Sequence, residues 1–332
     1  MRKDFRLLPG LGLVVLLFLS TGLMGCATSG GMNSGDSLSS GPKFSGSNSL
    51  ERMAANSNMR DIDSLSAPEL EHRGDMALRR NDYHVAFVHY DKALGKDPEN
   101  MDLTYKLGLL FVLSDMPGEA IPYLQKATQS KPERPMAHYL LGLAHYKIDD
   151  QKAAKKQLHQ AVKMDPGLWQ AYNLLGIIAD GDKKHLEAID FFQAAIALKP
   201  NNGQLNNNLG VASALAGEQG KAVQAFMRAL RNRYDEPRVY NNLGLALAGQ
   251  GRYQEALECF KKAGSEAQAY NNLGCVYLQK GDAVQAEKYF QKAIEQQPTF
   301  YSVANANLSK AGVKMSDAGT EELREGVERG EQ

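Results

Sequence analysis

The 332-residue chain lacks several features that mark common functional classes. Its 38 lysines and arginines balance 38 aspartates and glutamates, so it has no basic excess for binding a phosphate backbone. Its three cysteines are too few for a disulfide framework, and no Cys/His cluster has metal-ligand spacing. Walker, Gly-x-Ser-x-Gly, His-Glu-x-x-His and dinucleotide-binding motifs are also missing. These absences predict a non-catalytic protein with no cofactor, metal, nucleic acid or small-molecule substrate.

A long apolar run is missing too. The longest one, residues 11–19, is shorter than the roughly 20 residues that cross a bilayer core, and three basic residues precede it. This pattern predicts a secretory signal peptide over residues 1–25. The next residues, Leu-Met-Gly before Cys26, resemble a bacterial lipobox, which implies cleavage before Cys26 and acylation of its thiol. An uncleaved signal anchor, or a secretory signal with an incidental cysteine, is the alternative.

The residue after Cys26 is Ala27 rather than aspartate. In lipoproteins of Gram-negative bacteria this resembles the signal for the outer membrane, so the resemblance implies a lipid anchor on its periplasmic face. Residues 26–66 show no hydrophobic period, and serine and glycine dominate their first half. Such a segment buries too little apolar surface to fold alone, which predicts a flexible tether.

The rest of the chain repeats. Glycines recur at intervals of 34 residues and once of 30, at Gly74, Gly108, Gly142, Gly176, Gly210, Gly244 and Gly274. An alanine follows each glycine by 12 residues, from Ala86 to Ala286. A large residue, tyrosine, leucine or phenylalanine, comes four residues later, and a second alanine three residues after that. Small residues in such a pattern let paired helices approach, and the large residue fills the space between them.

This pattern resembles the tetratricopeptide repeat, a 34-residue helix-turn-helix unit. The resemblance implies an all-α solenoid, a right-handed superhelix of seven repeats over residues 67–300. The repeats are residues 67–100, 101–134, 135–168, 169–202, 203–236, 237–266 and 267–300. The sixth repeat is four residues short, either through a local deletion or as a change of superhelical pitch. Residues 301–332 are predicted to form a capping helix and a polar tail.

The resemblance also implies a peptide-binding groove lined by the first helix of each repeat. Transferred by position, its aromatic and apolar N-terminal part contains Tyr105, Leu109, Tyr139, Leu143 and Ile177. Its amide-rich part contains Asn173, Asn207, Asn208, Val211, Asn241, Asn242, Leu245, Asn271 and Asn272. Asparagine side chains both donate and accept hydrogen bonds, so a series of them can hold the backbone of an extended peptide. The alternative is that these asparagines are repeat consensus.

Only Lys106 and Arg238 give this face positive charge, which disfavours a clamp for peptide carboxylates. Cys259 and Cys275 are expected to be packing residues, although a disulfide between them stays possible. The leader, tether and repeats together resemble TadD-type lipoproteins of the tight-adherence (Flp) pilus secretion apparatus. The resemblance implies a scaffold that binds an envelope component such as a secretin. A type IV pilus pilotin-like lipoprotein and a regulator of peptidoglycan synthesis are the alternatives, and the oligomeric state stays open.

Overall fold

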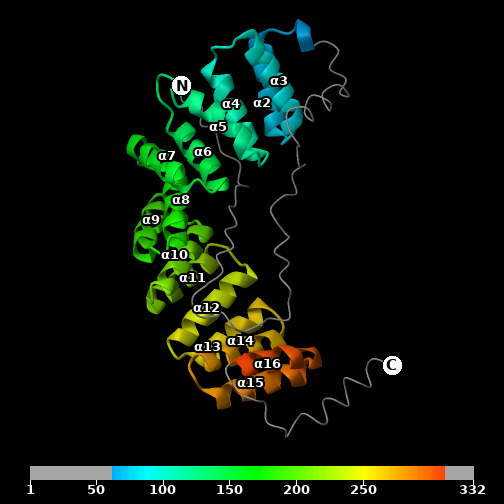
Figure 1. Cartoon of the computed structure of the whole chain (residues 1–332), viewed down its shortest axis with the longest axis vertical. Coiled ribbons are helices and arrows are strands. Elements are labelled where there is room, and N and C mark those ends of the chain that lie inside the picture. Colours follow the sequence, from blue (N-terminus) through cyan, green and yellow to red (C-terminus); the bar gives the residue numbers. More distant parts are fainter. Residues whose placement is uncertain (1–61, 311–332) are drawn as a thin grey trace, which may run out of the picture. The chain divides into compact units, whose positions relative to one another are not determined.

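The computed structural model describes residues 62–310, and all regular structure in this range is helical. Contacts divide the chain into two units, a first unit that ends at Ile178 and a second unit that begins at Ala179. Figure 1 shows their helices. The predicted signal peptide, Cys26, most of the tether and the polar tail lie outside the described residues. Among the described helices, none combines the length and the apolar character needed to cross a membrane.

The unit ending at Ile178 begins with a 3-10 helix and continues with helices that pack as antiparallel pairs, α2 with α3, α4 with α5 and α6 with α7. Its elements are η1 (Ile62–Ser64), α2 (Ala67–Arg79), α3 (Tyr83–Lys96), α4 (Met101–Leu113), α5 (Pro117–Ala127), α6 (Pro135–Lys147) and α7 (Gln151–Met164). Helix α8 (Trp169–Gly181) begins in this unit and ends in the next.

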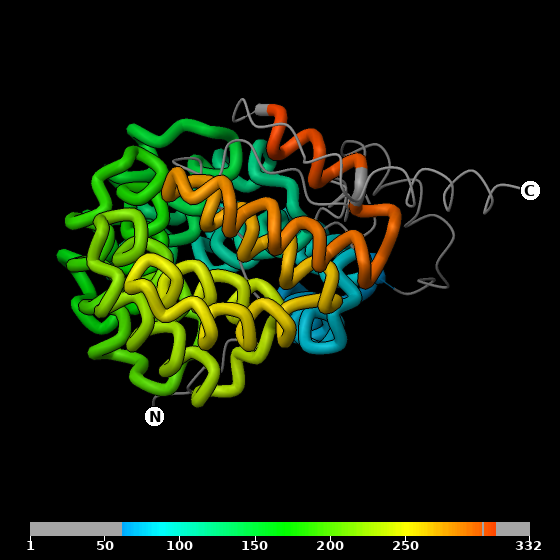
Figure 2. Tube along the Cα trace, turned by 90° about the horizontal axis from the view of Figure 1, so that it is seen from below, coloured from blue at the N-terminus to red at the C-terminus, as the bar shows by residue number. Residues whose placement is uncertain are grey.

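The unit from Ala179 pairs α10 with α11, α12 with α13 and α14 with α15, and α9 also packs on α10. Its elements are α9 (His185–Leu198), α10 (Gly203–Leu215), α11 (Gln219–Arg231), α12 (Pro237–Gly249), α13 (Tyr253–Ala263), α14 (Glu266–Gln279), α15 (Ala283–Gln296), η2 (Pro298–Phe300) and α16 (Tyr301–Lys310). Helix α16 follows α15 at the end of the described chain, where the sequence predicts a capping helix (Figure 2).

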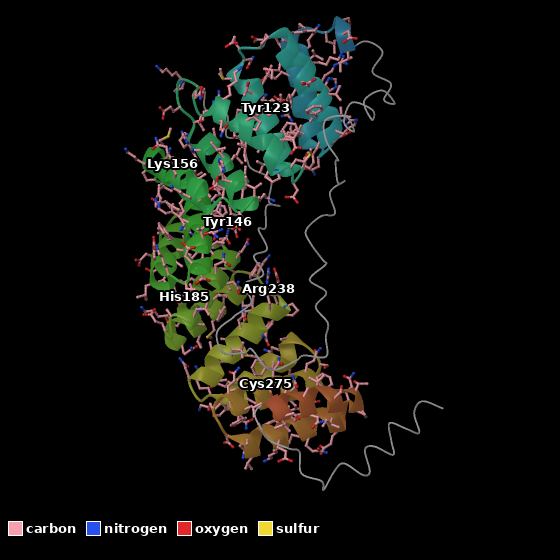
Figure 3. The ribbon with its side chains drawn as sticks, in the orientation of Figure 1. Tyr123, Tyr146, Lys156, His185, Arg238 and Cys275 are labelled. Atoms are coloured by element: carbon pink, nitrogen blue, oxygen red, sulfur yellow. The ribbon has the colours of Figure 1, made fainter. Side chains whose placement is uncertain are left out.

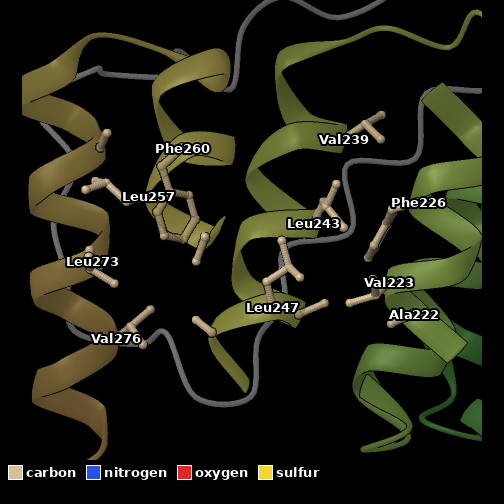
Figure 4. Packing of buried hydrophobic residues seen from close by; sticks show 14 of the residues in the cluster. Ala222, Val223, Phe226, Val239, Leu243, Leu247, Leu257, Phe260, Leu273 and Val276 are labelled. Carbon is tan, nitrogen blue, oxygen red and sulfur yellow. The ribbon is translucent and has the colours of Figure 1, made fainter. Parts of the chain in front are cut away.

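The repeated small and large residues form the core as the pattern predicts. The seven alanines from Ala86 to Ala286 are 0% exposed, and the large residues four positions later are at most 1% exposed. A Cβ added to Gly244 would lie 2.6 Å from the ring of Phe260, so the glycine lets α12 and α13 approach. Figure 4 shows Phe260 beside Leu257 on α13, with Leu243 and Leu247 on α12. Ala263 belongs to the second alanine of the repeat, three residues after the large residue. It is only half-buried, because it lies where the sixth repeat is shortened.

Each turn between paired helices contains one residue with positive φ. These residues are Asn81, Asp115, Asp149, Lys183, Gly217, Gly251 and Gly281, with φ between 58° and 81°. They share one position in the repeat, since they are 34 residues apart and 30 at the short repeat. Left-handed backbone favours glycine, and asparagine and aspartate tolerate it best among the other residues. The turn geometry is therefore the same in all seven turns even where the sequence has no glycine.

Two helix starts have the hydrogen bonds that their sequences predict. The Glu69 carboxylate accepts from the backbone N–H of Ser66 at 2.8 Å and from its hydroxyl at 2.7 Å. These bonds hold the pKa of Glu69 below its usual range. At the short repeat, Gln268 and Ser265 bond reciprocally at 2.9 and 3.2 Å. A capping box therefore begins α14 directly after α13 ends, without a long loop.

The predicted tether and the folded part overlap at residues 62–65. Ile62 is 7% exposed and packs with Leu70 and Tyr90 in the core of the first unit. The ammonium group of Lys96 donates to the carbonyls of Asp63 at 2.8 Å and Leu65 at 2.6 Å. Sequence periodicity missed this segment because a single apolar residue and two backbone contacts have no helical period.

Candidate functional site

The groove residues predicted in the first unit are aromatic and poorly hydrated. Tyr105 on α4 and Tyr139 on α6 are half-buried, and burial raises the pKa of each to about 12. Both phenols therefore stay protonated and uncharged at neutral pH. The guanidinium of Arg134 lies 5.4 Å from the centre of the Tyr105 ring, a cation–π contact at the edge of this surface. Leu109 is half-buried and Leu143 is 1% exposed, so Leu143 belongs to the core.

The charge of Lys106 is already neutralised. Its ammonium group lies 2.7 Å from the Glu71 carboxylate and 2.6 Å from that of Asp75. Asp75 also accepts a hydrogen bond from the hydroxyl of Tyr90 at 2.7 Å, which ties α4 to both helices of the first pair. Lys106 is thus a structural bridge between neighbouring repeats, and it leaves no cation there for a peptide carboxylate.

Arg238 on α12 is held in a similar way. Its guanidinium lies 2.6 Å from the Glu236 carboxylate and contacts the hydroxyl and ring of Tyr234. Burial raises the pKa of Tyr234 to about 12, so the phenol is neutral beside the cation. The Arg238 Nε–H is buried and has no hydrogen-bond partner. One donor of this arginine is therefore unsatisfied within the described chain.

The amides of the second unit connect neighbouring first helices. The Asn272 side chain on α14 donates to the Asn241 side chain on α12 at 3.0 Å. Asn208 and Asn242 are half-buried on the same series of helices, as are Leu245 and, on α8, Asn173. Val211 is 8% exposed and Ile177 is 3% exposed. The structure therefore brings the amides of Asn241 and Asn272 together in one hydrogen bond. It places Val211 and Ile177 mainly in the core.

Asn207 on α10 has an unsatisfied acceptor. The residue is 7% exposed and its Oδ1 has no hydrogen-bond partner, while its Nδ2 lies 3.5 Å from Asn208 Oδ1, at the limit of a hydrogen bond. A buried acceptor without a partner costs about 1–3 kcal/mol. A buried group of this kind needs an explanation, and a bound peptide N–H is one partner that would satisfy it.

Asn271 is placed differently from its predicted role. It is 0% exposed, and Asn307 on α16 donates to its Oδ1 at 3.5 Å while lying 3.7 Å from Cys275 Sγ. Asn307 is itself 1% exposed. Helix α16 therefore covers Asn271 and closes the amide series at the C-terminal end. No local sequence signal marks this pairing, because it joins residues 36 positions apart in different elements.

The other polar and sulfur-containing candidates have structural surroundings. Cys259 is a free thiol, so it forms no disulfide with Cys275, and burial raises its pKa. His138 is 9% exposed, and its Nδ1 lies 2.8 Å from Gln157 Oε1 on the partner helix. No group of three or more metal-ligating side chains occurs within residues 62–310. Figure 3 marks Cys275 and Arg238, which lie on different first helices of the second unit.

A tyrosine cluster that the sequence analysis did not single out lies in the second unit. The rings of Tyr253 and Tyr277 are 4.7 Å apart, and those of Tyr277 and Tyr289 stack at 5.4 Å. The Lys280 ammonium lies 4.8 Å from the Tyr253 ring. These rings come from α13, α14 and α15 and contribute to packing between successive helices. The three tyrosines occupy different positions of the repeat, so no sequence period marks the cluster.

Helical hairpins with these glycine, alanine and aromatic contacts define a repeat protein of the tetratricopeptide type. Family profiles described as tetratricopeptide repeat match residues 114–154, 150–203, 237–263 and 267–300. Residues 264–266, between the last two matches, lie where the sixth repeat is shortened. The protein is therefore an all-α tetratricopeptide-repeat solenoid.

Among the similar solved structures, one with a TM-score above 0.5 agrees on the fold. A tetratricopeptide repeat protein from Parabacteroides merdae is 14% identical, with a TM-score of 0.51, over 73% of this chain and 98% of that one. A MamA protein matches 53% of this chain and 94% of its own, at 28% identity and a TM-score of 0.46. YrrB, described as having an unusual peptide-binding site, matches 55% and 95%, at 23% identity and a TM-score of 0.47. No curated protein matches the chain.

Proposed function

We propose that this protein is a non-catalytic, lipid-anchored scaffold that binds an extended segment of a protein partner along its first helices. The observation that carries the proposal is the polar character of this face in the second unit. Asn272 and Asn241 bond across neighbouring helices, and Asn207 presents a buried oxygen that has no partner. A peptide in extended conformation exposes backbone N–H groups that could bond to such an oxygen.

The partner is proposed to be a component of an envelope assembly, such as the secretin of a tight-adherence pilus system. Support comes from the lipobox-like residues before Cys26, the tether and the repeat array, which together resemble TadD-type lipoproteins. The anchor would place the protein on the periplasmic face of the outer membrane. A pilotin-like role in type IV pili and regulation of peptidoglycan synthesis are the competing assignments, because both use repeat lipoproteins.

The anchor is tested by Cys26→Ser, since serine has no thiol to acylate. The variant should fold with unchanged helicity by circular dichroism and leave the outer-membrane fraction. A variant that still fractionates with the outer membrane would refute acylation as the means of attachment. Intact mass measurement of the wild-type protein provides the control, because acylation adds a defined mass.

The partner is tested by photo-crosslinking in living cells. A photoreactive side chain at Leu245, half-buried on α12, reports on the first-helix face. The same probe at Val284, 75% exposed on α15, is the matched control in the same unit. Crosslinks to a secretin or pilin from Leu245 but not from Val284 would support the pilus assignment. Crosslinks to a cell-wall synthase would favour the alternative, and equal yields from both positions would contradict binding at this face.

A further inference from the structure

Helix α7 presents basic side chains directly opposite its buried face. Ala154, Leu158 and Ala161 are 0% exposed and anchor the helix to the unit. Three exposed lysines occupy the other side, at Lys152, Lys156 and Lys163. At about 100° per residue they fall within about 40° of the helix circumference, roughly 180° from the buried alanines. We call these three residues the lysine stripe; Figure 3 marks Lys156 on α7.

The lysine stripe is not neutralised within the described chain. Within residues 62–310, none of its three ammonium groups forms a hydrogen bond or an ion pair, and α7 contains no carboxylate side chain. The nearest acidic residues in sequence lie outside the helix. Asp150 Oδ1 accepts from Ala153 N at 3.0 Å, and Asp165 Oδ1 accepts from Gly167 N at 2.8 Å. Asp150 thus caps the start of α7 and Asp165 holds the turn after its end, and neither carboxylate pairs with a lysine of the stripe.

The repeat provides an internal comparison. The equivalent positions on α15 carry Val284, Lys288 and Glu295, which sum to no net charge. On each of the other second helices, α3, α5, α9, α11 and α13, these positions carry at most one lysine or arginine. The helical-hairpin scaffold therefore does not require a basic face, and the lysine stripe is specific to the third pair.

The kind of side chains on this surface and the length that they cover indicate the chemistry of its ligand. The exposed large apolar residues of the described chain do not include any from α7, so the stripe has no anchor for reading a partner's side chains. The stripe extends about 16 Å along one helix. Lysine ammonium groups are flexible point charges and lack the planar fork with which arginine binds one defined anion. An extended surface with many anionic groups matches this geometry better than a single anion.

We propose that the lysine stripe docks the solenoid onto a membrane surface through anionic phospholipid headgroups. The proposal rests on the proposed lipid anchor, which would hold the protein close to a membrane. Each lysine near an anionic bilayer contributes about a fivefold gain in binding, so the three together give on the order of a hundredfold. Docking through α7 would fix one side of the unit on the lipid and leave the first helices for a partner.

The first test uses the lipid-anchored protein in phosphatidylcholine vesicles, with and without phosphatidylglycerol. An amine-reactive, membrane-impermeant reagent should label the lysine stripe several-fold less on the anionic vesicles, and high salt should restore labelling. Lys184 and Lys288, exposed on α9's N-cap and α15, serve as references and should label equally on both. Equal labelling of the stripe on the two vesicle types would overturn the proposal.

The second test separates the stripe from the anchor by using the full chain with Cys26→Ser. Changing the lysine stripe to glutamine should lower its partitioning onto phosphatidylglycerol vesicles on the order of a hundredfold. A control removes the same charge from the exposed residues Arg228, Arg231 and Arg233 and should leave partitioning unchanged.

Equal losses in both variants would mean that only net charge matters and would refute a specific stripe. A stripe variant that loses binding to polyglutamate or DNA, but not to these vesicles, would assign the surface to a soluble polyanion and refute docking to lipid. If intact mass measurement shows no acyl chain on the wild-type protein, the proposed lipid anchor is refuted. The vesicle comparison still tests whether the lysine stripe binds anionic lipid.

Discussion

The substitution Asn207→Leu is expected to raise the stability of the protein and to weaken its binding to a partner. Leucine has the same branched outline as asparagine, and the change removes the buried Oδ1 that has no partner. Relief of that desolvation penalty is worth about 1–3 kcal/mol, while the marginal contact with Asn208 contributes little. We therefore expect the variant to unfold at higher denaturant concentration than the wild type. Urea titration followed by circular dichroism measures this change, since every described element is helical.

The same substitution should weaken partner capture. A peptide N–H that loses its acceptor in a dry groove costs about 1–3 kcal/mol, which corresponds to roughly a five- to hundredfold loss of affinity. The crosslinking yield from Leu245 in cells reports this loss. Greater stability with weaker capture is the combination that a ligand-binding polar group predicts, because such a group is satisfied only in the complex.

Asn206→Leu is the matched control on the same helix. Asn206 is 1% exposed and also has an unpartnered Oδ1, but its Nδ2 donates to Asn202 O at 2.9 Å. Its change should alter stability without affecting crosslinking, since the residue precedes the predicted groove position. If Asn207→Leu destabilises the protein and leaves crosslinking unchanged, Asn207 is a packing residue and the reasoning fails.

Further predictions concern the scaffold. Gly251→Ala should lower the free energy of unfolding by about 1 kcal/mol, because φ is +78° at this turn residue. Gly95→Ala should raise it by about 0.5–1 kcal/mol, because Gly95 lies inside α3 and an added Cβ would have no atom within 4 Å. Urea titration of both variants tests the turn geometry. Tyr105 and Tyr139 have pKa values of about 12, above about 10 in the unfolded chain, so their contribution to stability is complete below pH 10. Stability should fall as pH rises from about 10 to 12, and phenolate absorbance should show both groups titrating late unless unfolding comes first.

Sequence periodicity predicts the helical pairs well because it records their contacts directly. Gly244 and Phe260 are 16 residues apart, and their close approach follows from the alternation of small and large residues. The capping box at Ser265 is equally local. Lys183 shows the limit, since a lysine gives no local signal for the positive φ that the shared turn geometry imposes.

The candidate site is less predictable because its properties depend on contacts between elements. Asn207 and Asn271 occupy the same repeat position, yet one has an unsatisfied oxygen and the other lies beneath α16. Their sequence contexts do not distinguish them. The lysine stripe, in contrast, could have been found from sequence by comparing the outward positions of each second helix.

The central claim is that the first-helix face binds the backbone of an extended partner segment. The most direct test measures, by calorimetry, the affinity of the segment crosslinked from Leu245 as two synthetic peptides. One carries N-methyl groups on its backbone amides and the other carries alanine in place of its side chains. Loss of an N–H donor should weaken binding about tenfold or more, while the alanine peptide should bind within a few-fold of the original. Tight binding of the N-methylated peptide with loss of binding by the alanine peptide would contradict the account.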